Sequence, residues 1–221
     1  TEEERAFMYE RYAPDPKMRK NLGIRRRLAP LLGGDRRKIE LLNGLLLSLP
    51  GSPILYYGDE IGMGDEYLLE DRDGVRTPMQ WTEGPGAGFS DAPPQDLYLP
   101  LVTDPAYSPE KVNVASQVDD PGSLLSWTKR MLHLRRRHPV FGLGSFLALP
   151  TAKAPILCFL REHGPERVLV AANLSSAPVD VPLPEVGGSW VDAAGTDVVW
   201  SEAAPLHLEP YAFRWLVPAE G

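Results

Sequence analysis

Apolar residues recur at helical spacing in three parts of the chain. Near the start, Met8, Tyr9 and Tyr12 are spaced like one face of a short helix that ends at the prolines after residue 13. Asp35 can cap a second helix that runs to about Ser48 and carries a broad apolar face. A third amphipathic helix is predicted over residues 122–137, where a proline follows it.

A short apolar run follows the second helix and ends in two acidic residues. After the break at residues 50–53, the run Ile54–Tyr57 is consistent with a buried strand, and Asp59 and Glu60 follow it closely. The order of helix, turn, strand and carboxylates is typical of half an α/β unit. Active sites in parallel α/β folds lie at the carboxyl ends of such strands.

The rest of the chain divides into a long loop and a β-rich tail. Residues 58–121 show little periodicity and contain many Gly, Pro and Asp residues, which predicts a functional excursion or a small subdomain. After about Gly144, short β-type runs alternate with turn residues every 10–15 positions, which predicts an antiparallel β-sandwich. We therefore expect an α/β domain over residues 1–144 and a β-sandwich domain over residues 145–221.

Composition narrows the classes of ligand and compartment. The 221 residues carry a net charge of −7, which disfavours nucleic acid as a partner and favours neutral or cationic ligands. A lone cysteine, Cys158, excludes a disulfide framework and indicates a reducing, cytoplasmic location with the thiol in the core. No apolar run approaches the ~20 residues needed to cross a membrane. The chain begins at Thr1 rather than Met, so we expect it to be part of a longer protein.

Candidate chemistry concentrates in the acidic and aromatic loop. Carboxylates and arginines alternate at Asp71, Arg72, Asp73 and Arg76, a pattern that serves either to hold sugar hydroxyls or to form surface ion pairs. Asp59 and Glu60 serve either acid–base chemistry or loop capping and ion pairing. Aromatic residues of this loop can stack on sugar faces or anchor the loop: Trp81, Phe89, Tyr98 and Tyr107.

Other residue types give no distinct site. The four histidines lack metal-ligand spacing, and no nucleotide-binding or Ser-His-Asp pattern is present, so neither a metal nor a cofactor is predicted. The arginine triplets at 25–27 and 135–137 are best interpreted as helix-surface charges or as partners of the many carboxylates.

Four segments of the chain resemble the α-amylase superfamily of glycoside hydrolases. Residues 51–63 (GSPILYYGDEIGM) resemble its eighth-strand motif, and residues 71–81 (DRDGVRTPMQW) resemble the loop that follows in its α-glucosidase branch. Residues 21–32 (NLGIRRRLAPLL) and 35–41 (DRRKIEL) are more selective and resemble the trehalose synthases, which are maltose glucosylmutases. The resemblance covers about residues 1–145, and the tail is only loosely similar to the family's C-terminal β-sandwich.

This resemblance implies a (β/α)8 barrel, of which the chain holds the C-terminal part. It also implies a retaining reaction run by three carboxylates, the last of them in an Asn-His-Asp motif. That motif is absent from this sequence, so the resemblance places all three carboxylates before Thr1. The implied reaction interconverts maltose and α,α-trehalose by intramolecular glucosyl transfer.

Few site residues can be carried over from the family. Arg72 is the first choice and Arg76 the second for contacting the sugar, with Asp71 or Asp73 orienting the arginine. Asp59 and Glu60 are expected at the pocket rim. The expected partners are a small-molecule sugar and the preceding part of the barrel, and the resemblance leaves open a homo-oligomer and a maltokinase partner.

Two alternatives stay open. One is an α-glucosidase or sucrose isomerase of the same branch, against which residues 21–41 argue. The other is a non-catalytic module that binds a glycan or a partner, for which tail tryptophans such as Trp190, Trp200 or Trp215 could serve if they were exposed.

Overall fold

The computed structural model describes residues 1–151, 155–182, 186–195, 199–201 and 205–219. Contacts between residues divide the chain into two compact units. The first contains Thr1–Ile39 and Leu55–Thr128, and the second contains Glu40–Ile54 and Lys129–Gly221. The expected domain boundary after residue 144 is a different division and stays a prediction.

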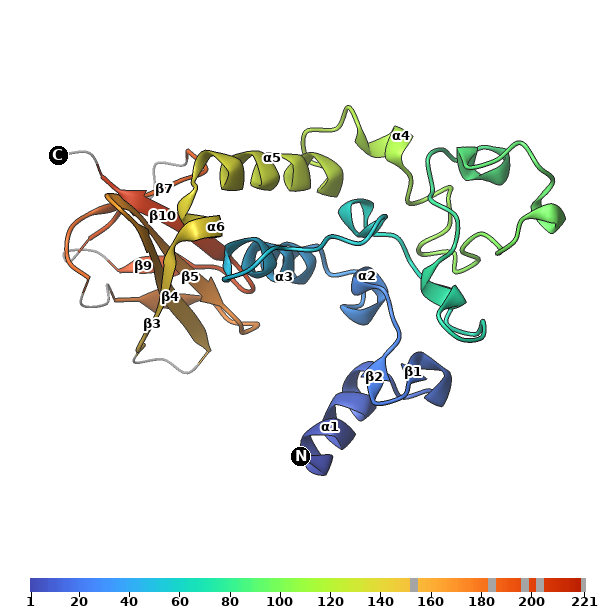
Figure 1. Cartoon of the computed structure of the whole chain (residues 1–221), viewed down its shortest axis with the longest axis horizontal. Helices are drawn as coiled ribbons and strands as arrows, with labels where there is room; N and C mark the ends of the chain where they lie inside the picture. The colour runs from blue at the N-terminus through green and yellow to red at the C-terminus, as the bar shows by residue number, and fades with distance from the viewer. Residues whose placement is uncertain (152–154, 183–185, 196–198, 202–204, 220–221) are drawn as a thin grey trace. The chain divides into compact units, whose positions relative to one another are not determined.

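The helices follow the predicted periodicity closely. They are α1 (Glu2–Tyr12), α2 (Leu28–Leu31), α3 (Arg36–Ser48), α4 (Val114–Gln117), α5 (Leu124–Arg137) and α6 (Val140–Leu143). A capping box between Thr1 and Glu4 begins α1. The carboxylate of Asp35 accepts a hydrogen bond from the Arg37 amide at 3.0 Å at the start of α3. The three predicted helices are thereby confirmed (Figure 1).

The first unit contains little regular structure apart from its helices. Its strands are the two-residue pair β1 (Arg19–Lys20) and β2 (Gly23–Ile24), and single 3₁₀ turns occur along residues 59–96. Two small apolar clusters hold it together, one around Ile61 and Met63 and the other around Ala29 and Leu124. The predicted irregular loop over residues 58–121 is thus confirmed, with only α4 as an α-helix inside it.

The prediction of a buried strand over Ile54–Tyr57 is wrong for this structure. The segment belongs to no strand, and the exposed fractions are 83% for Ile54 and 41% for Tyr56. A strand exists only when a neighbour satisfies its backbone N–H and C=O groups. No strand pairs with residues 54–57 in the described part of the chain, so the apolar run alone cannot form one.

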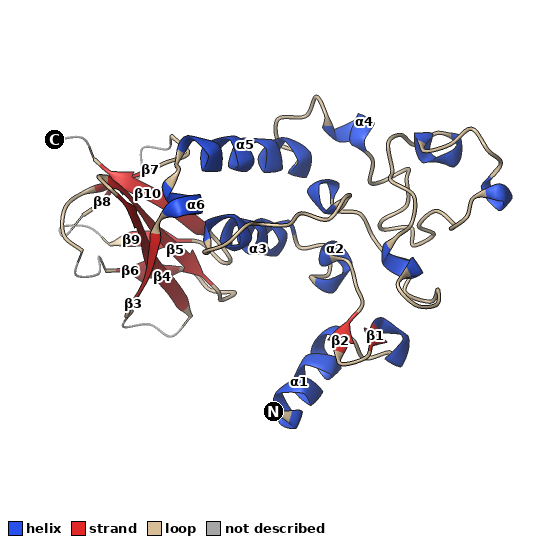
Figure 2. Cartoon of the chain, in the orientation of Figure 1, coloured by secondary structure: helices blue, strands red, loops and turns tan. Residues whose placement is uncertain are grey.

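The second unit contains an antiparallel β-sandwich, as predicted (Figure 2). One sheet has the order β3-β4-β5-β10-β7-β8 and the other pairs β6 with β9. The strands are β3 (Ser145–Leu149), β4 (Ile156–His163), β5 (Glu166–Asn173), β6 (Val179–Val181), β7 (Trp190–Asp192), β8 (Val199–Trp200), β9 (Leu206–Leu208) and β10 (Phe213–Pro218).

Both sheets contribute side chains to one core. Cys158 lies in it at 2% exposure, as predicted, and burial raises the pKa of its thiol to about 12. Trp190 and Trp200 belong to the same core, and Trp215 is 2% exposed on β10. These three tryptophans are buried, so they offer no exposed aromatic surface for a glycan.

Helix α3 approaches the sheet of its own unit closely at one glycine. A methyl group on Gly44 would lie 2.4 Å from the ring of Phe213 on β10, so a larger residue cannot fit there without movement. Within the described residues, no helix combines the length and apolar character needed to cross a membrane.

Candidate functional site

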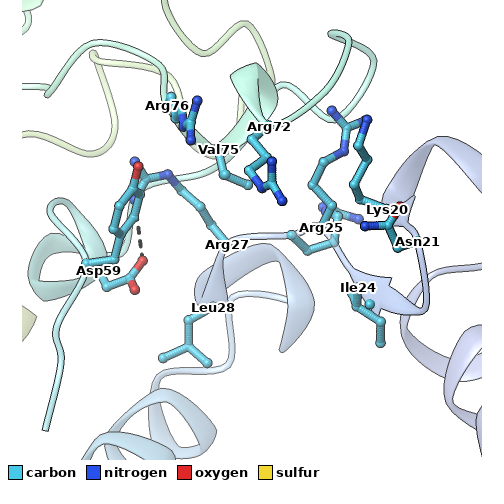
Figure 3. A pocket seen from close by; sticks show the side chains of 13 residues that line it. Lys20, Asn21, Ile24, Arg25, Arg27, Leu28, Asp59, Arg72, Val75 and Arg76 are labelled. Carbon is cyan, nitrogen blue, oxygen red and sulfur yellow. Dashed lines mark hydrogen bonds and ion pairs between the residues drawn. The ribbon is translucent and has the colours of Figure 1, made fainter. Parts of the chain in front are cut away.

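A cavity of about 480 Å³ lies in the first unit, and six of its thirteen lining residues are cations (Figure 3). The segment from β1 to α2 forms one wall, and the turn around residues 72–76 forms another. Among its described lining residues the carboxylate is Asp59 and the cations are Lys20, Arg25, Arg26, Arg27, Arg72 and Arg76. Such a surface offers many N–H donors to the oxygen atoms of a ligand.

Arg27 is the most buried of these cations, with 2% of its surface exposed. Its Nη1 atom donates to the Tyr57 carbonyl oxygen at 2.6 Å and lies 3.4 Å from a carboxylate oxygen of Asp59. The guanidinium also lies over the Tyr57 ring, 4.7 Å from its centroid. Its Nε and Nη2 atoms are buried without a hydrogen-bond partner among the described residues, so Arg27 has donors to spare.

Asp59 lies at the start of a 3₁₀ turn, Asp59–Ile61, that two left-handed glycines make possible. Gly58 has φ of 85° and Gly62 has φ of 77°. The Asp59 side chain is 20% exposed, and burial raises its pKa against the opposing effect of Arg27, with the charge of Glu60 adding to the rise. The structure thus holds a carboxylate in a position that disfavours its charge.

The guanidinium groups of Arg25 and Arg26 hydrogen-bond other parts of the chain, so these residues form the cavity wall rather than bind a ligand. The Arg25 guanidinium donates to four backbone carbonyl oxygens, those of Lys17, Tyr67, Leu69 and Asp71. The Nε atom of Arg26 contacts both oxygens of the buried Asp65 carboxylate at 3.0 and 2.9 Å. Their expected role as partners of carboxylates therefore holds for Arg26, whereas Arg25 binds carbonyls. Residues 25–27 lie outside the helices, so the helix-surface interpretation is wrong for them.

Arg72 and Arg76 flank the 3₁₀ turn Asp73–Val75 and both line the cavity with exposed side chains. Arg72 lies 3.8 Å from an Asp71 oxygen, a loose pairing. Asp71 pairs more closely with Lys20, at 2.7 Å, and this hydrogen bond lowers the pKa of Asp71. The expectation that Asp71 or Asp73 orients an arginine therefore stays a prediction.

Glu60 faces a second cavity of about 440 Å³ in the same unit. Four of its eleven lining residues are aromatic, and Arg76 lines this cavity as well as the first one. The two cavities therefore share one arginine. Among the described residues, no group of three or more His, Cys, Asp or Glu side chains is placed to hold a metal ion.

Sequence reasoning did not select Lys20, Arg27 or Tyr56 as site residues, although all three line the first cavity. The arginine triplet was a usable signal, since three adjacent cations in an acidic chain need unusual surroundings. The separate roles of Arg26 and Arg27 depend on segments 30 or more residues away in sequence, which the pattern does not indicate.

Two family descriptions match the chain. Residues 25–144 match "Alpha amylase, catalytic domain", and residues 146–215 match "Maltogenic Amylase, C-terminal domain". The first match alone covers more than half of the 221 residues.

Curated relatives match over 83% of the chain. The sequence is 59% identical to a trehalose synthase of Thermus thermophilus and 53% identical to one of Pimelobacter sp. (strain R48). It is 54% identical to the trehalose synthase/amylase TreS of Mycobacterium tuberculosis. The chain spans 19%, 33% and 31% of the lengths of these three relatives, respectively.

Solved structures of the same group share the fold. The α-glucosyl transfer enzyme XgtA matches with a TM-score of 0.72 and 32% identity, over 88% of this chain and 38% of that one. The trehalulose synthase MutB from Pseudomonas mesoacidophila MX-45 matches with a TM-score of 0.70 and 22% identity, over 90% and 42%. By its sequence matches and its fold, this chain belongs to the α-amylase family, of which it holds part of the catalytic domain and the C-terminal domain.

Proposed function

We propose that this chain is part of a trehalose synthase, which interconverts maltose and α,α-trehalose by retaining intramolecular glucosyl transfer. The observation that carries the proposal is the 53–59% identity to proteins named trehalose synthase over 83% of the chain. Relatives named α-glucosidase are less similar, with 34% identity over 66% of the chain for one from Rhizobium meliloti. The proposal therefore favours the isomerase over the hydrolase.

In the proposed protein, the three catalytic carboxylates come from the part of the barrel that precedes this sequence. The 221 residues then supply cavity walls and not the nucleophile or the acid–base group. Their side chains hold the sugar and keep water away from the reacting carbon, because water would divert glucosyl transfer into hydrolysis.

Arg72 is proposed to contact the glucose ring, with Arg76 as the second candidate. Both side chains are exposed, and both line the cation-rich cavity. The 3.8 Å separation between Arg72 and Asp71 leaves the Arg72 guanidinium able to donate elsewhere. Asp59 and Glu60 are proposed to shape the rim, Asp59 beside Arg27 and Glu60 in the aromatic cavity.

The proposed setting is cytoplasmic, and it rests on the reducing environment that a lone buried thiol suits. The preceding part of the barrel is the partner that the proposal requires.

The test is product analysis on the complete protein that contains this sequence. Incubation with maltose should yield mainly trehalose, and incubation with sucrose should yield little isomer. Glucose as the main product from maltose would indicate a hydrolytic α-glucosidase, and isomerised sucrose would indicate a sucrose isomerase. Binding of glycan without turnover of either sugar would favour a non-catalytic module.

Arg72→Ala should lower trehalose formation at least tenfold and raise the share of glucose released, because a lost hydrogen bond to substrate loosens the closed pocket. Arg136→Ala is the matched control, since Arg136 is an exposed arginine at the end of α5. Equal maltose kinetics in the Arg72→Ala and Arg136→Ala proteins would remove Arg72 from the site.

A further inference from the structure

The loop over residues 66–76, which carries Arg72, is closed at its base by its own backbone. The Glu66 amide donates to the Gly74 carbonyl oxygen at 2.9 Å, and a methyl group on Gly74 would lie 2.5 Å from the Glu66 carbonyl oxygen. All residues of this loop are described, and its regular structure is limited to the 3₁₀ turn Asp73–Val75. The position of the rest of the loop therefore depends on contacts from outside it.

The guanidinium of Arg25 supplies such contacts from a segment 42–46 residues earlier in the chain. Its Nη1 atom donates to the carbonyl oxygens of Leu69, at 2.6 Å, and of Asp71, and its Nη2 atom donates to that of Tyr67 at 2.7 Å. Nη2 also donates to the Lys17 carbonyl oxygen. Arg25 is only 9% exposed, and a charged donor makes stronger hydrogen bonds than a neutral one. One side chain thereby fixes three alternate carbonyl groups of the loop.

Asp71, the residue before Arg72, has a backbone conformation that needs this support. Its φ of 45° lies in the left-handed region, which is unfavourable for a residue other than glycine. Arg25 binds its carbonyl oxygen, and Lys20 binds its carboxylate at 2.7 Å. Residues 20–25 thus hold both ends of the strained residue from which the chain continues to Arg72.

The Arg72 side chain is held only loosely by its own contacts. It is 55% exposed and lies 3.8 Å from a carboxylate oxygen of Asp71. Its place at the cation-rich cavity therefore depends on the backbone from which it extends. In enzymes, a displacement of about 1 Å in a group that holds the substrate can lower the rate about a hundredfold.

We propose that Arg25 is a positioning residue that acts through Arg72, by holding the loop over residues 66–76 so that the Arg72 guanidinium lies at the cavity (Figure 3). Arg25 does not bind the sugar itself, because its Nη1 and Nη2 atoms already donate to four carbonyl oxygens. The inference rests on the proposed function for the reaction in which Arg72 takes part.

The first test measures amide hydrogen exchange in the complete protein that contains this sequence. The Leu69 and Asp73 amides donate to carbonyl oxygens of the same loop at 3.0 and 3.1 Å, so their exchange reports opening of the loop. Arg25→Lys keeps the charge but loses the planar fork of donors, and it should speed exchange of both amides at least tenfold. An unchanged exchange rate at both amides would overturn the inference.

Arg161→Lys is the matched control for a buried arginine that binds backbone carbonyls. Arg161 is 1% exposed in the second unit and donates to the carbonyl oxygens of Ser48, Ser145 and Gly144. Its replacement should leave exchange in the loop over residues 66–76 at the parent rate. Equal acceleration there by Arg161→Lys and Arg25→Lys would indicate general destabilisation and would overturn the inference.

Product analysis on maltose tests whether Arg25 acts through Arg72. Arg25→Lys should lower trehalose formation about three- to tenfold and raise the share of glucose released, whereas Arg161→Lys should leave that share unchanged. In the double variant of Arg25→Lys and Arg72→Ala, the loss should equal that of Arg72→Ala alone, because the arginine that Arg25 positions is gone. Losses that multiply in the double variant would overturn the inference.

Lys20→Gln is a milder variant whose folding is not at risk, because the pair of Lys20 with Asp71 is about half exposed. It removes one support of the same loop and should shift the products in the same direction by about twofold. An opposite shift would contradict the inference.

The same set of proteins separates this inference from the proposed function. Release of glucose from maltose without trehalose would refute the proposed function, and the double variant would then test Arg25 through the rate of glucose release. Parent kinetics in the Arg72→Ala protein would overturn the inference, and trehalose formation by that protein would keep the proposed function.

Discussion

The guanidinium of Arg161 on β4 donates a hydrogen bond to the backbone carbonyl oxygen of Ser48, the last residue of α3, at 2.6 Å. The same group donates to the carbonyls of Ser145 at 2.7 Å and Gly144 at 3.0 Å, and Arg161 is 1% exposed. One buried cation thus satisfies the end of a helix and the start of β3. Cations stabilise helix C-termini because of the partial negative charge there.

Replacing Arg161 with alanine should lower the free energy of unfolding by roughly 3 kcal/mol or more, because buried carbonyls lose a charged donor. Urea unfolding followed by circular dichroism measures the change. Arg167→Ala, which removes a partly exposed pair with Glu162, should cost about 1 kcal/mol or less. A similar small cost for Arg161→Ala would contradict the role assigned to Arg161.

Gly58→Ala should destabilise the chain by roughly 1–3 kcal/mol, the cost of a non-glycine residue in a left-handed conformation. The new methyl group would also lie 2.3 Å from the sulfur of Met63, which is buried. Gly142→Ala is the control, since Gly142 lies in α6 with open space around it, and alanine there should be neutral or stabilising. Equal unfolding midpoints for the two variants would show that the turn at Gly58 relaxes easily.

Asp59→Asn should raise the stability of the chain at pH 7. The pKa of Asp59 is raised by burial, so the folded state prefers the neutral carboxyl. The chain therefore loses stability as the pH rises from 3.8, the pKa of the carboxyl in the unfolded state, through the higher pKa of the folded state. Asparagine carries no charge at any of these pH values and avoids this loss. The comparison is the urea midpoint of the parent and Asp59→Asn chains at pH 7 and at pH 3.

Glu110→Gln provides the opposite control, because a hydrogen bond from Ser108 lowers the pKa of Glu110 and its charge stabilises the folded state at pH 7. A less stable Asp59→Asn chain at pH 7 would mean that the contact with Arg27 outweighs the burial of the charge. The proposed role of Asp59 at the pocket rim predicts that Asp59→Asn lowers trehalose formation by the complete protein even where it raises stability.

His207 should make the β-sandwich more stable at low pH. Its Nδ1 atom lies 2.7 Å from an Asp180 oxygen across the β6–β9 pair, and this hydrogen bond raises the pKa of His207 above 6.5. The stabilisation is complete below pH 6.5 and is lost as pH rises through the folded pKa. The difference in Tm between parent and His207→Gln chains should accordingly be larger at pH 5.5 than at pH 9.

The Asp180→Asn variant provides the check by NMR titration of the His207 ring. The titration midpoint of the His207 ring should be lower in the variant than in the parent chain, because the variant lacks the Asp180 carboxylate that hydrogen-bonds the ring. Glu209 lies 3.4 Å from the other ring nitrogen and should retain a smaller part of the effect. An unchanged midpoint would show that Asp180 does not set the charge of His207.

Several short strands could not be predicted from the sequence. β3, β7 and β9 were not singled out from the sequence, and they exist because they pair with β4, β10 and β6. The segment Phe146–Leu147 is even exposed, so hydrophobic alternation gives no signal there. Pairing with a neighbouring strand, rather than composition, makes these residues strands.

The sequence by itself determined the helices α1, α3 and α5, the β-rich character of the tail after residue 144, and membership of the α-amylase family. These features depend on periodicity, caps and motifs, which act over a few residues. Only the tertiary structure decided that Ile54–Tyr57 has no strand partner in the described part of this chain, that Arg25 and Arg26 support loops, and that Arg27 reaches Tyr57 and Asp59. The physical reason is that hydrogen bonds and burial bring together residues that are far apart in sequence. The local pattern of apolar and polar residues does not indicate which distant residues will meet.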